Sequence, residues 1–220
     1  MAKQLAFIHT VPALAPTFVD LARQHLPAWE TFNIADESLL RNTIRQGLTD
    51  TTKRRLAGYV WSAVDAGADA ILVTCSSIGP AVDAARALSP VPLFRIDEAM
   101  ADAAVAIGPR VGVLATLRST LEPTREIVAR RAALAGKTTT ILHDVCEGAF
   151  EALQRGDRDA HDQAVAAAVR RMLPSVDAIV LAQASMARVL DGMPKEEITV
   201  PVLTSPALAV ERVARTLAAS

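Results

Sequence analysis

The sequence contains few of the residues that mark several common classes of protein. Only two of its 220 residues are cysteines, its four histidines are scattered, and aromatic residues make up 4% of the chain. Two distant cysteines form neither a disulfide framework nor a zinc-ligand cluster. We therefore expect no metal site, free thiols and a cytoplasmic setting.

Charge and hydropathy argue against a nucleic-acid-binding protein and against a membrane protein. Lys+Arg total 23 and Asp+Glu total 24, a formal net charge of −1, so the composition offers no basic surface for nucleic acid. No apolar run approaches the roughly 18 residues that cross a bilayer, and the start of the chain lacks a signal-peptide pattern. No glycine-rich phosphate loop is found. We expect a protein that binds no nucleic acid, no membrane and no nucleotide or dinucleotide.

Short apolar runs alternate with longer segments of helical period along the whole chain. Near-continuous apolar runs such as "AILV" and "AIVL" are typical of strands covered on both faces. Parallel neighbours need crossover connections, which the helical segments supply, so the pattern predicts an α/β fold with parallel sheets. The predicted strands are 5–9, 31–34, 70–74, 93–96, 111–115, 139–143, 178–182 and 200–203.

The order of these elements repeats within the chain. "LAFIHT" at 5–10 matches "VGVLAT" at 111–116, "ADAILVTCSS" at 68–77 matches "VDAIVLAQAS" at 176–185, and "VPLF" at 91–94 matches "VPVL" at 200–203. The repeat predicts two pseudo-symmetric domains, each with a four-stranded parallel sheet flanked by helices. We place the first domain at 1–105 plus a C-terminal helix at 206–220, and the second at 106–205.

Polar residues follow the central strand of each half. Ligands of open α/β sheets bind at the carboxyl ends of the strands, so we predict an active site in the cleft between the two domains. The residues expected around it are Thr10, Cys75, Ser76, Ser77, Thr116, Gln183, Ala184 and Ser185.

Cys75 is the main candidate for chemistry in this set. It follows a strand and precedes a helix, where the partial positive charge of the helix N-terminus is expected to lower the pKa of a thiol. A thiolate there acts as a base towards a carbon acid or as a nucleophile. Ser76 and Ser77, with neighbouring N–H groups, suit a substrate carboxylate. The structural alternatives are a buried packing cysteine and helix-capping serines.

These motifs resemble the cofactor-independent aspartate/glutamate/hydantoin racemase superfamily over essentially the whole chain. That superfamily also includes arylmalonate decarboxylase and maleate isomerase. The resemblance implies two α/β domains, each offering a cysteine, a small-molecule carboxylate substrate and no cofactor. By the same analogy we expect a homo-oligomer, with a dimer favoured. The residues that carry the resemblance are His9-Thr10, Cys75-Ser76-Ser77, Ala115-Thr116 and Ser119-Thr120.

The second cysteine motif departs from the family. Glutamate racemases are similar to Leu-Gly-Cys-Thr-His at this point, whereas this chain places Gln183 at the cysteine position. A two-thiol racemase removes the α-proton with one cysteine and returns a proton from the other face, and Gln183 has no acid–base function.

Three functions therefore stay open. The first is a cofactor-independent racemase or isomerase that acts on a small carboxylate or amino-acid-like carbon acid through Cys75. The second is a single-thiol decarboxylase or lyase of the same fold. The third is a non-catalytic small-molecule-binding protein that lost the second thiol.

Two residues are candidates for the missing acid or base. His9 ends the first strand and titrates near neutral pH, although a lone histidine is more often structural. Cys146, in "LHDVCEGAFEAL", either faces the cleft or packs within an amphipathic helix. Ser119, three residues before Glu122, also has the spacing of a capping box.

Overall fold

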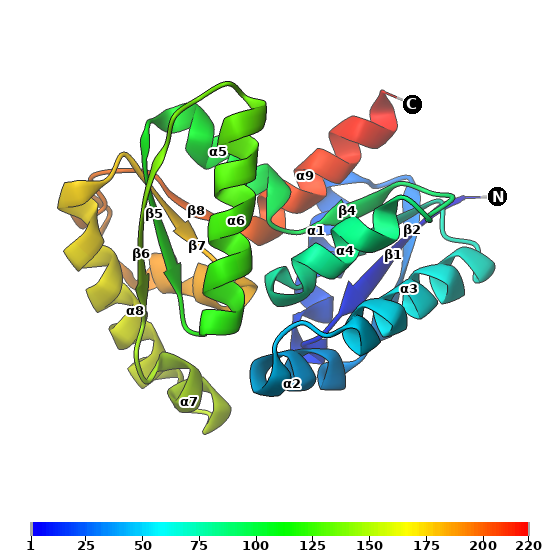
Figure 1. The fold of residues 1–220 in the computed structure, drawn as a ribbon, viewed down its shortest axis with the longest axis horizontal. Helices are drawn as coiled ribbons and strands as arrows, with labels where there is room; N and C mark the ends of the chain where they lie inside the picture. The colour runs from blue at the N-terminus through cyan, green and yellow to red at the C-terminus, as the bar shows by residue number, and fades with distance from the viewer. Residues whose placement is uncertain (1, 220) are drawn as a thin grey trace. The chain divides into compact units, whose positions relative to one another are not determined.

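The computed structural model describes residues 2–219, which form two compact units (Figure 1). By internal contacts, the first unit contains the residues up to Ile96 together with those from Pro206 onward. The second unit runs from Asp97 to Ser205. Each unit contains one four-stranded sheet in which every neighbouring pair of strands is parallel.

The first sheet has the strand order β2-β1-β3-β4. Its strands follow the apolar runs of the sequence, and all four residues of β3 are buried, as expected for a central strand covered on both faces. The strands are β1 (Lys3–His9), β2 (Trp29–Ala35), β3 (Ala70–Val73) and β4 (Leu93–Arg95).

Helices cover both faces of this sheet because successive strand residues point to opposite sides. Leu39 of α2, Leu56 of α3 and Val82 of α4 form one apolar cluster with alternate residues of β1 and β3. On the other face, Phe18 of α1 contacts Phe7 of β1, with ring centroids 5.7 Å apart. The helices are α1 (Ala15–His25), α2 (Glu37–Gln46), α3 (Asp50–Asp65), α4 (Gly79–Arg86) and α9 (Ser205–Ala218), with short 3₁₀ turns η1 (Pro12–Leu14) and η2 (Ser76–Ile78).

The second sheet has the equivalent order β6-β5-β7-β8. Helices α7 and α8 share an apolar cluster with β5 and β7, while α5 and α6 pack together and against β5, β6, β7 and β8. The elements are β5 (Arg110–Ala115), β6 (Thr140–Val145), β7 (Ala178–Leu181), β8 (Val202–Thr204), α5 (Glu98–Ile107), α6 (Arg118–Leu134), α7 (Ala149–Gln154), α8 (Arg158–Met172), η3 (Leu173–Ser175), η4 (Ala184–Gly192) and η5 (Lys195–Glu197).

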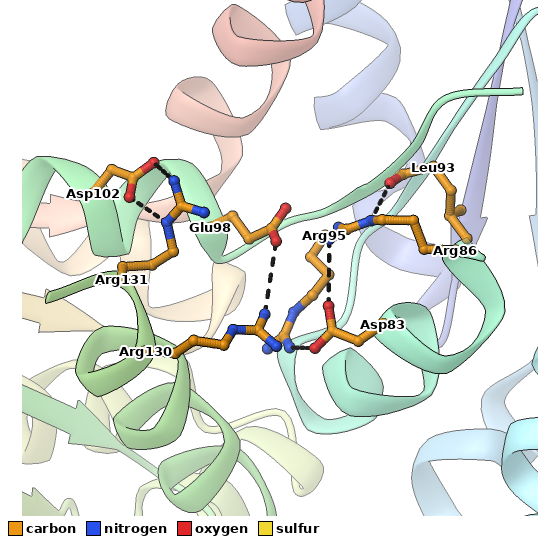
Figure 2. A network of polar contacts seen from close by, with 8 residues as sticks. All are labelled: Asp83, Arg86, Leu93, Arg95, Glu98, Asp102, Arg130 and Arg131. Atoms are coloured by element: carbon orange, nitrogen blue, oxygen red, sulfur yellow. Dashed lines mark hydrogen bonds and ion pairs between the residues drawn. The ribbon is translucent and has the colours of Figure 1, made fainter. Parts of the chain in front are cut away.

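The predicted fold class, α/β with two four-stranded parallel sheets flanked by helices, is confirmed. The division between the units falls before α5, whereas the boundary predicted from the repeat lies inside this helix, between residues 105 and 106. The reason is packing, since α5 contacts α6 and Arg131 of α6 binds Asp102 of α5 through two hydrogen bonds (Figure 2).

Within residues 2–219, no helix combines the length and the apolar character that crossing a membrane would require.

Candidate functional site

Cys75 lies where β3 ends and the chain turns towards α4. The residue has extended backbone angles, φ −134° and ψ 115°, and the 3₁₀ turn η2 separates it from the first residue of α4. Ile78, the N-cap residue of α4, makes no side-chain cap. Cys75 itself is partly accessible to solvent. The strand–turn–helix setting predicted for this residue is therefore present.

Hydrogen-bond donors surround the sulfur of Cys75. The hydroxyls of Thr10 and Ser77 and the backbone N–H groups of Ser77 and Ile78 bond to Sγ. Thr10 and Ser77 are themselves buried, which holds the donors in place. These residues come from the carboxyl ends of β1 and β3, and we call Thr10, Cys75, Ser76 and Ser77 the first strand-end cluster.

The pKa of the Cys75 thiol is shifted in the direction opposite to the prediction. Burial raises the pKa, and the hydrogen bonds from Thr10, Ile78 and Ser77 lower it by less than burial raises it. The helix N-terminus does supply N–H donors, but desolvation penalises a thiolate more strongly than these donors favour it. In the isolated chain the thiol form is therefore favoured at neutral pH.

His9 lies beside this cluster and is fully buried. Its Nδ1 is 2.8 Å from Thr74 Oγ1 and its Nε2 is 2.8 Å from Asn33 Oδ1. Burial lowers the pKa of His9, against the opposing effect of the Asn33 hydrogen bond, and so favours the neutral ring. With a neutral ring, Nε2–H donates to Asn33 and Nδ1 accepts from the Thr74 hydroxyl, whose single hydrogen is then not given to the Ile8 carbonyl 3.3 Å away. Both ring nitrogens are thus engaged.

Gln183 and Thr116 lie together at the carboxyl ends of β7 and β5. The Thr116 N–H donates to Gln183 Oε1 at 2.6 Å, and Gln183 Nε2 donates to Thr116 Oγ1 at 2.6 Å. This pair closes a ring of two hydrogen bonds, and Thr116 is buried. The Gln183 amide therefore fixes the Thr116 hydroxyl and backbone.

The other residues predicted in the second unit lie close by in the chain. Ala184 and Ser185 begin the 3₁₀ helix η4, whose N-cap is Gln183, and no side chain caps it. Ser119 and Thr120 lie in the first turn of α6. We call Thr116, Ser119, Thr120, Gln183, Ala184 and Ser185 the second strand-end cluster.

The capping box predicted at Ser119 is absent. Leu117 is the N-cap of α6 and makes no side-chain cap. Among the described residues the buried Ser119 Oγ has no hydrogen-bond partner. The N-cap lies two residues earlier than the box requires, because Leu117 keeps the extended conformation of an N-cap with φ −139°. The first turn of α6 therefore has an unused hydroxyl beside uncapped backbone N–H groups.

The side chain of Cys146 packs in an apolar core, although its backbone N–H donates to the carbonyl of Ala115, the residue before Thr116, at 2.8 Å. It is 2% exposed and belongs to the apolar cluster of the second unit, where it joins Ala149 of α7 and Val165 of α8. Burial and the negative charge of Asp144 raise its pKa to about 12, against the lowering effect of Arg171. Such a thiol matches the packing interpretation of the sequence rather than the acid–base one.

Two polar groups of the first unit escaped the sequence reasoning. Asp36 caps α2 and accepts hydrogen bonds from Ser38 and Tyr59 as well as from Arg55. Burial alone would raise the pKa of Asp36, but the bonds from Ser38 and Tyr59 and the charge of Arg55 hold it below its usual range. Asp before a helical run was the available signal for this cap.

The second group joins Arg95, at the end of β4, to Asp83 of α4 (Figure 2). No sequence pattern marks it, because an isolated arginine in an apolar strand has no periodicity of its own. Within residues 2–219, no three histidine, cysteine or acidic side chains gather as a metal site would require.

Each unit is an α/β fold with hydroxyl side chains at the carboxyl ends of its central strands, and the first unit also has a cysteine there. Open α/β sheets bind their ligands at these strand ends. The profile of the Asp/Glu/hydantoin racemase family matches residues 10–213, and the chain belongs to this family. Membership supports an enzyme with a racemase or isomerase function.

Solved structures show the same fold at low sequence identity. Allantoin racemase from Klebsiella pneumoniae is 21% identical with a TM-score of 0.71, covering 99% of this chain and 88% of that one. Glutamate racemase from Thermus thermophilus is 22% identical with a TM-score of 0.73, covering 99% and 81%. Glutamate racemase from Francisella tularensis is 14% identical with a TM-score of 0.76, covering 99% and 81%. Among curated protein sequences none matches the chain.

Proposed function

We propose that the chain is a cofactor-independent racemase or isomerase that acts on a small carboxylate or amino-acid-like carbon acid, with Cys75 as its acid–base residue. The observation that carries this assignment is the set of donors around Sγ, from the Thr10 and Ser77 hydroxyls and the Ser77 and Ile78 N–H groups. A cysteine that only packs needs no such donors. A cysteine that alternates between thiol and thiolate does, because they stabilise the charged form.

The first step is removal of the substrate proton α to the carboxylate. Cys75 as thiolate takes that proton, and the electron pair left on carbon spreads into the carboxylate as an enediolate. Donors fixed in advance lower the barrier to this step because they need no reorganisation as charge develops. Candidates for the carboxylate oxygens are the Ser76 hydroxyl in the first unit and, in the second, the Ser119 hydroxyl with the uncapped backbone N–H groups of the first turn of α6.

Returning a proton to the opposite face requires a second proton carrier. Among its described residues, the second strand-end cluster offers hydroxyls and an amide rather than a thiol. Gln183 is held by Thr116, so it orients a polar group and transfers no proton. Proton return from that side then depends on a water held by these groups.

One observation favours a second candidate, a single-thiol decarboxylase or lyase. The raised pKa of Cys75 keeps a proton on sulfur, which suits delivery better than removal. In that reaction the substrate loses CO₂, the carbon–carbon electron pair stays on the α-carbon, and the Cys75 S–H protonates that carbon. The resulting thiolate regains its proton from water. Only one face is used, so no second thiol is needed.

Deuterium exchange separates these candidates. The protein is incubated in heavy water with each enantiomer of small α-amino acids, with hydantoins, and with α-substituted malonates. A racemase washes deuterium into the α-position of the amino acid or hydantoin, while a decarboxylase releases CO₂ from the malonate and labels the product. Cys75→Ser abolishes whichever reaction occurs. Cys146→Ser is the matched control, because the second cysteine is buried in the core, and it keeps the activity.

No exchange and no CO₂ release with any of these substrates, from a folded protein, would contradict both catalytic candidates. Calorimetric binding of the same carboxylates without turnover would then support the third interpretation, a small-molecule-binding protein.

A further inference from the structure

Arg95 is a buried charge in the first unit. Its side chain is 3% exposed, and Nη1 lies 2.5 Å from Asp83 Oδ2 of α4. Asp83 Oδ1 also lies 3.5 Å from Arg86 Nη1, and Arg86 Nε donates to the carbonyl of Leu93 at 3.0 Å. Asp83 thus pairs with Arg95 through one carboxylate oxygen and with Arg86 through the other, and these contacts join α4 to β4 (Figure 2).

The guanidinium of Arg95 packs directly against Gly79, the first residue of α4. A Cβ on Gly79 would lie 2.3 Å from Nη2, 2.5 Å from Cζ and 2.8 Å from Nε of Arg95. Gly79 has φ −51°, a helical value open to any residue, so glycine is needed here for space rather than for its backbone freedom. The arginine cannot swing aside freely because its buried head is held by Asp83.

This contact lies one residue from the donors around Cys75. Gly79 follows Ile78, whose N–H bonds to Sγ, and the Gly79 N–H closes the turn η2 on the Ser76 carbonyl. Because Gly79 is bonded to Ile78 and closes the same turn, a displacement of Gly79 also displaces the Ser77 and Ile78 N–H groups. A hydrogen bond weakens steeply as its geometry departs from ideal, so small shifts here act on the sulfur.

We propose that Arg95 is a positioning residue for the Cys75 thiol, acting through the flat contact of its guanidinium with Gly79. Asp83 holds the guanidinium, the guanidinium supports the first turn of α4, and that turn aims two N–H donors at Sγ. This role deepens the proposed function and rests on it, since aiming donors at the sulfur matters to a reaction only if Cys75 takes part in one. Lysine cannot replace arginine here, because an ammonium carries the charge without the planar surface.

The test measures the thiol itself and not turnover, so it stands whether or not a substrate is found. Iodoacetamide alkylation of Cys75 is followed by peptide mass spectrometry from pH 7 to 10.5 on folded protein, and the midpoint of the rate against pH gives the thiol pKa. Arg95→Met and Arg95→Lys are expected to raise the midpoint by about one pH unit, which is about tenfold slower alkylation at a fixed pH below it.

Gly79→Ala provides the second arm as a double-mutant cycle. Alone it is expected to raise the midpoint, because the new methyl group collides with the guanidinium. In an Arg95→Ala background the same change is expected to have less than half that effect, since the colliding group is gone. If circular dichroism shows that Gly79→Ala does not fold, the pH profile of alkylation in Arg95→Lys tests the role of Arg95 instead.

The second unit offers a matched control. There a Cβ on Gly108 would lie 2.6 Å from Asp177 Cβ, and Asp177 pairs with Arg110. Gly108→Ala and Arg110→Met therefore disturb a glycine packed on an ion pair without touching the Cys75 turn, and the alkylation midpoint is expected to stay unchanged. A wild-type midpoint in folded Arg95→Lys, or equal effects of Gly79→Ala with and without Arg95, would overturn the assignment.

Discussion

The side chain of Gln183 is bound to Thr116 by two hydrogen bonds of 2.6 Å, one to the backbone N–H and one to the hydroxyl. The amide is thus an ordered element that fixes a neighbouring hydroxyl at the carboxyl ends of β5 and β7.

Gln183→Cys is expected to restore a proton carrier in the second strand-end cluster. If the substrate is a carbon acid, α-deuterium exchange from the less reactive enantiomer should rise by about 10²-fold, the usual scale of one acid–base group. Mass spectrometry of each enantiomer in heavy water measures it. Gln183→Leu, which removes both hydrogen bonds without adding a thiol, is the control and should show no gain. Equal exchange in both variants would rule out the thiol as the cause.

Cys75 is expected to react slowly at neutral pH. Burial raises the pKa of its thiol, so the alkylation midpoint should lie above about 8.5, the ordinary value for cysteine. Thr10→Val removes one donor to the sulfur and should raise the midpoint further. Peptide mass spectrometry after iodoacetamide treatment reads both cysteines in one experiment. Fast labelling of Cys75 at pH 6 would contradict a raised pKa, because it would show that the thiolate is already populated at that pH.

His9 makes the stability of the protein depend on pH. Its folded-state pKa lies below the unfolded value of about 6.5. The unfolded chain therefore binds the proton more readily, and the stabilisation from the neutral ring is complete above pH 6.5 and is lost as the pH falls below it. Urea unfolding at pH 7.5 and 5.5 should show a drop for the wild type and a smaller drop for His9→Gln. Equal drops would assign the effect to another group.

Among the polar residues of the first unit, Asp36 is expected to contribute strongly to the free energy of unfolding. It caps α2 through Ser38 and accepts bonds from Tyr59 and Arg55. Asp36→Ala removes the cap and leaves partly buried donors unpaired, which should cost about 1–3 kcal/mol of the free energy of unfolding. Chemical denaturation checks this value. Asp50→Ala is the control, since Asp50 forms a surface ion pair with Lys53 and should change stability little.

The sequence by itself determined the architecture. Apolar runs such as "AILV" and "AIVL" became buried central strands, and helical segments between them left parallel pairing as the consistent arrangement. The internal repeat anticipated two sheets with equivalent strand orders. The repeat also aligned Cys75 with Gln183, because each follows the end of a matched strand. The residues that follow parallel strands lie at the same edge of a sheet.

Tertiary structure decided the properties of those residues. Whether a thiol at a strand end is acidic depends on the balance of desolvation against donors, and for Cys75 burial outweighs the N–H groups supplied by the helix. The partners of Gln183, the burial of Cys146 and the contact of Arg95 with Gly79 join residues distant in sequence or remote from any motif. Such pairings follow from close packing in three dimensions, which no one-dimensional period encodes.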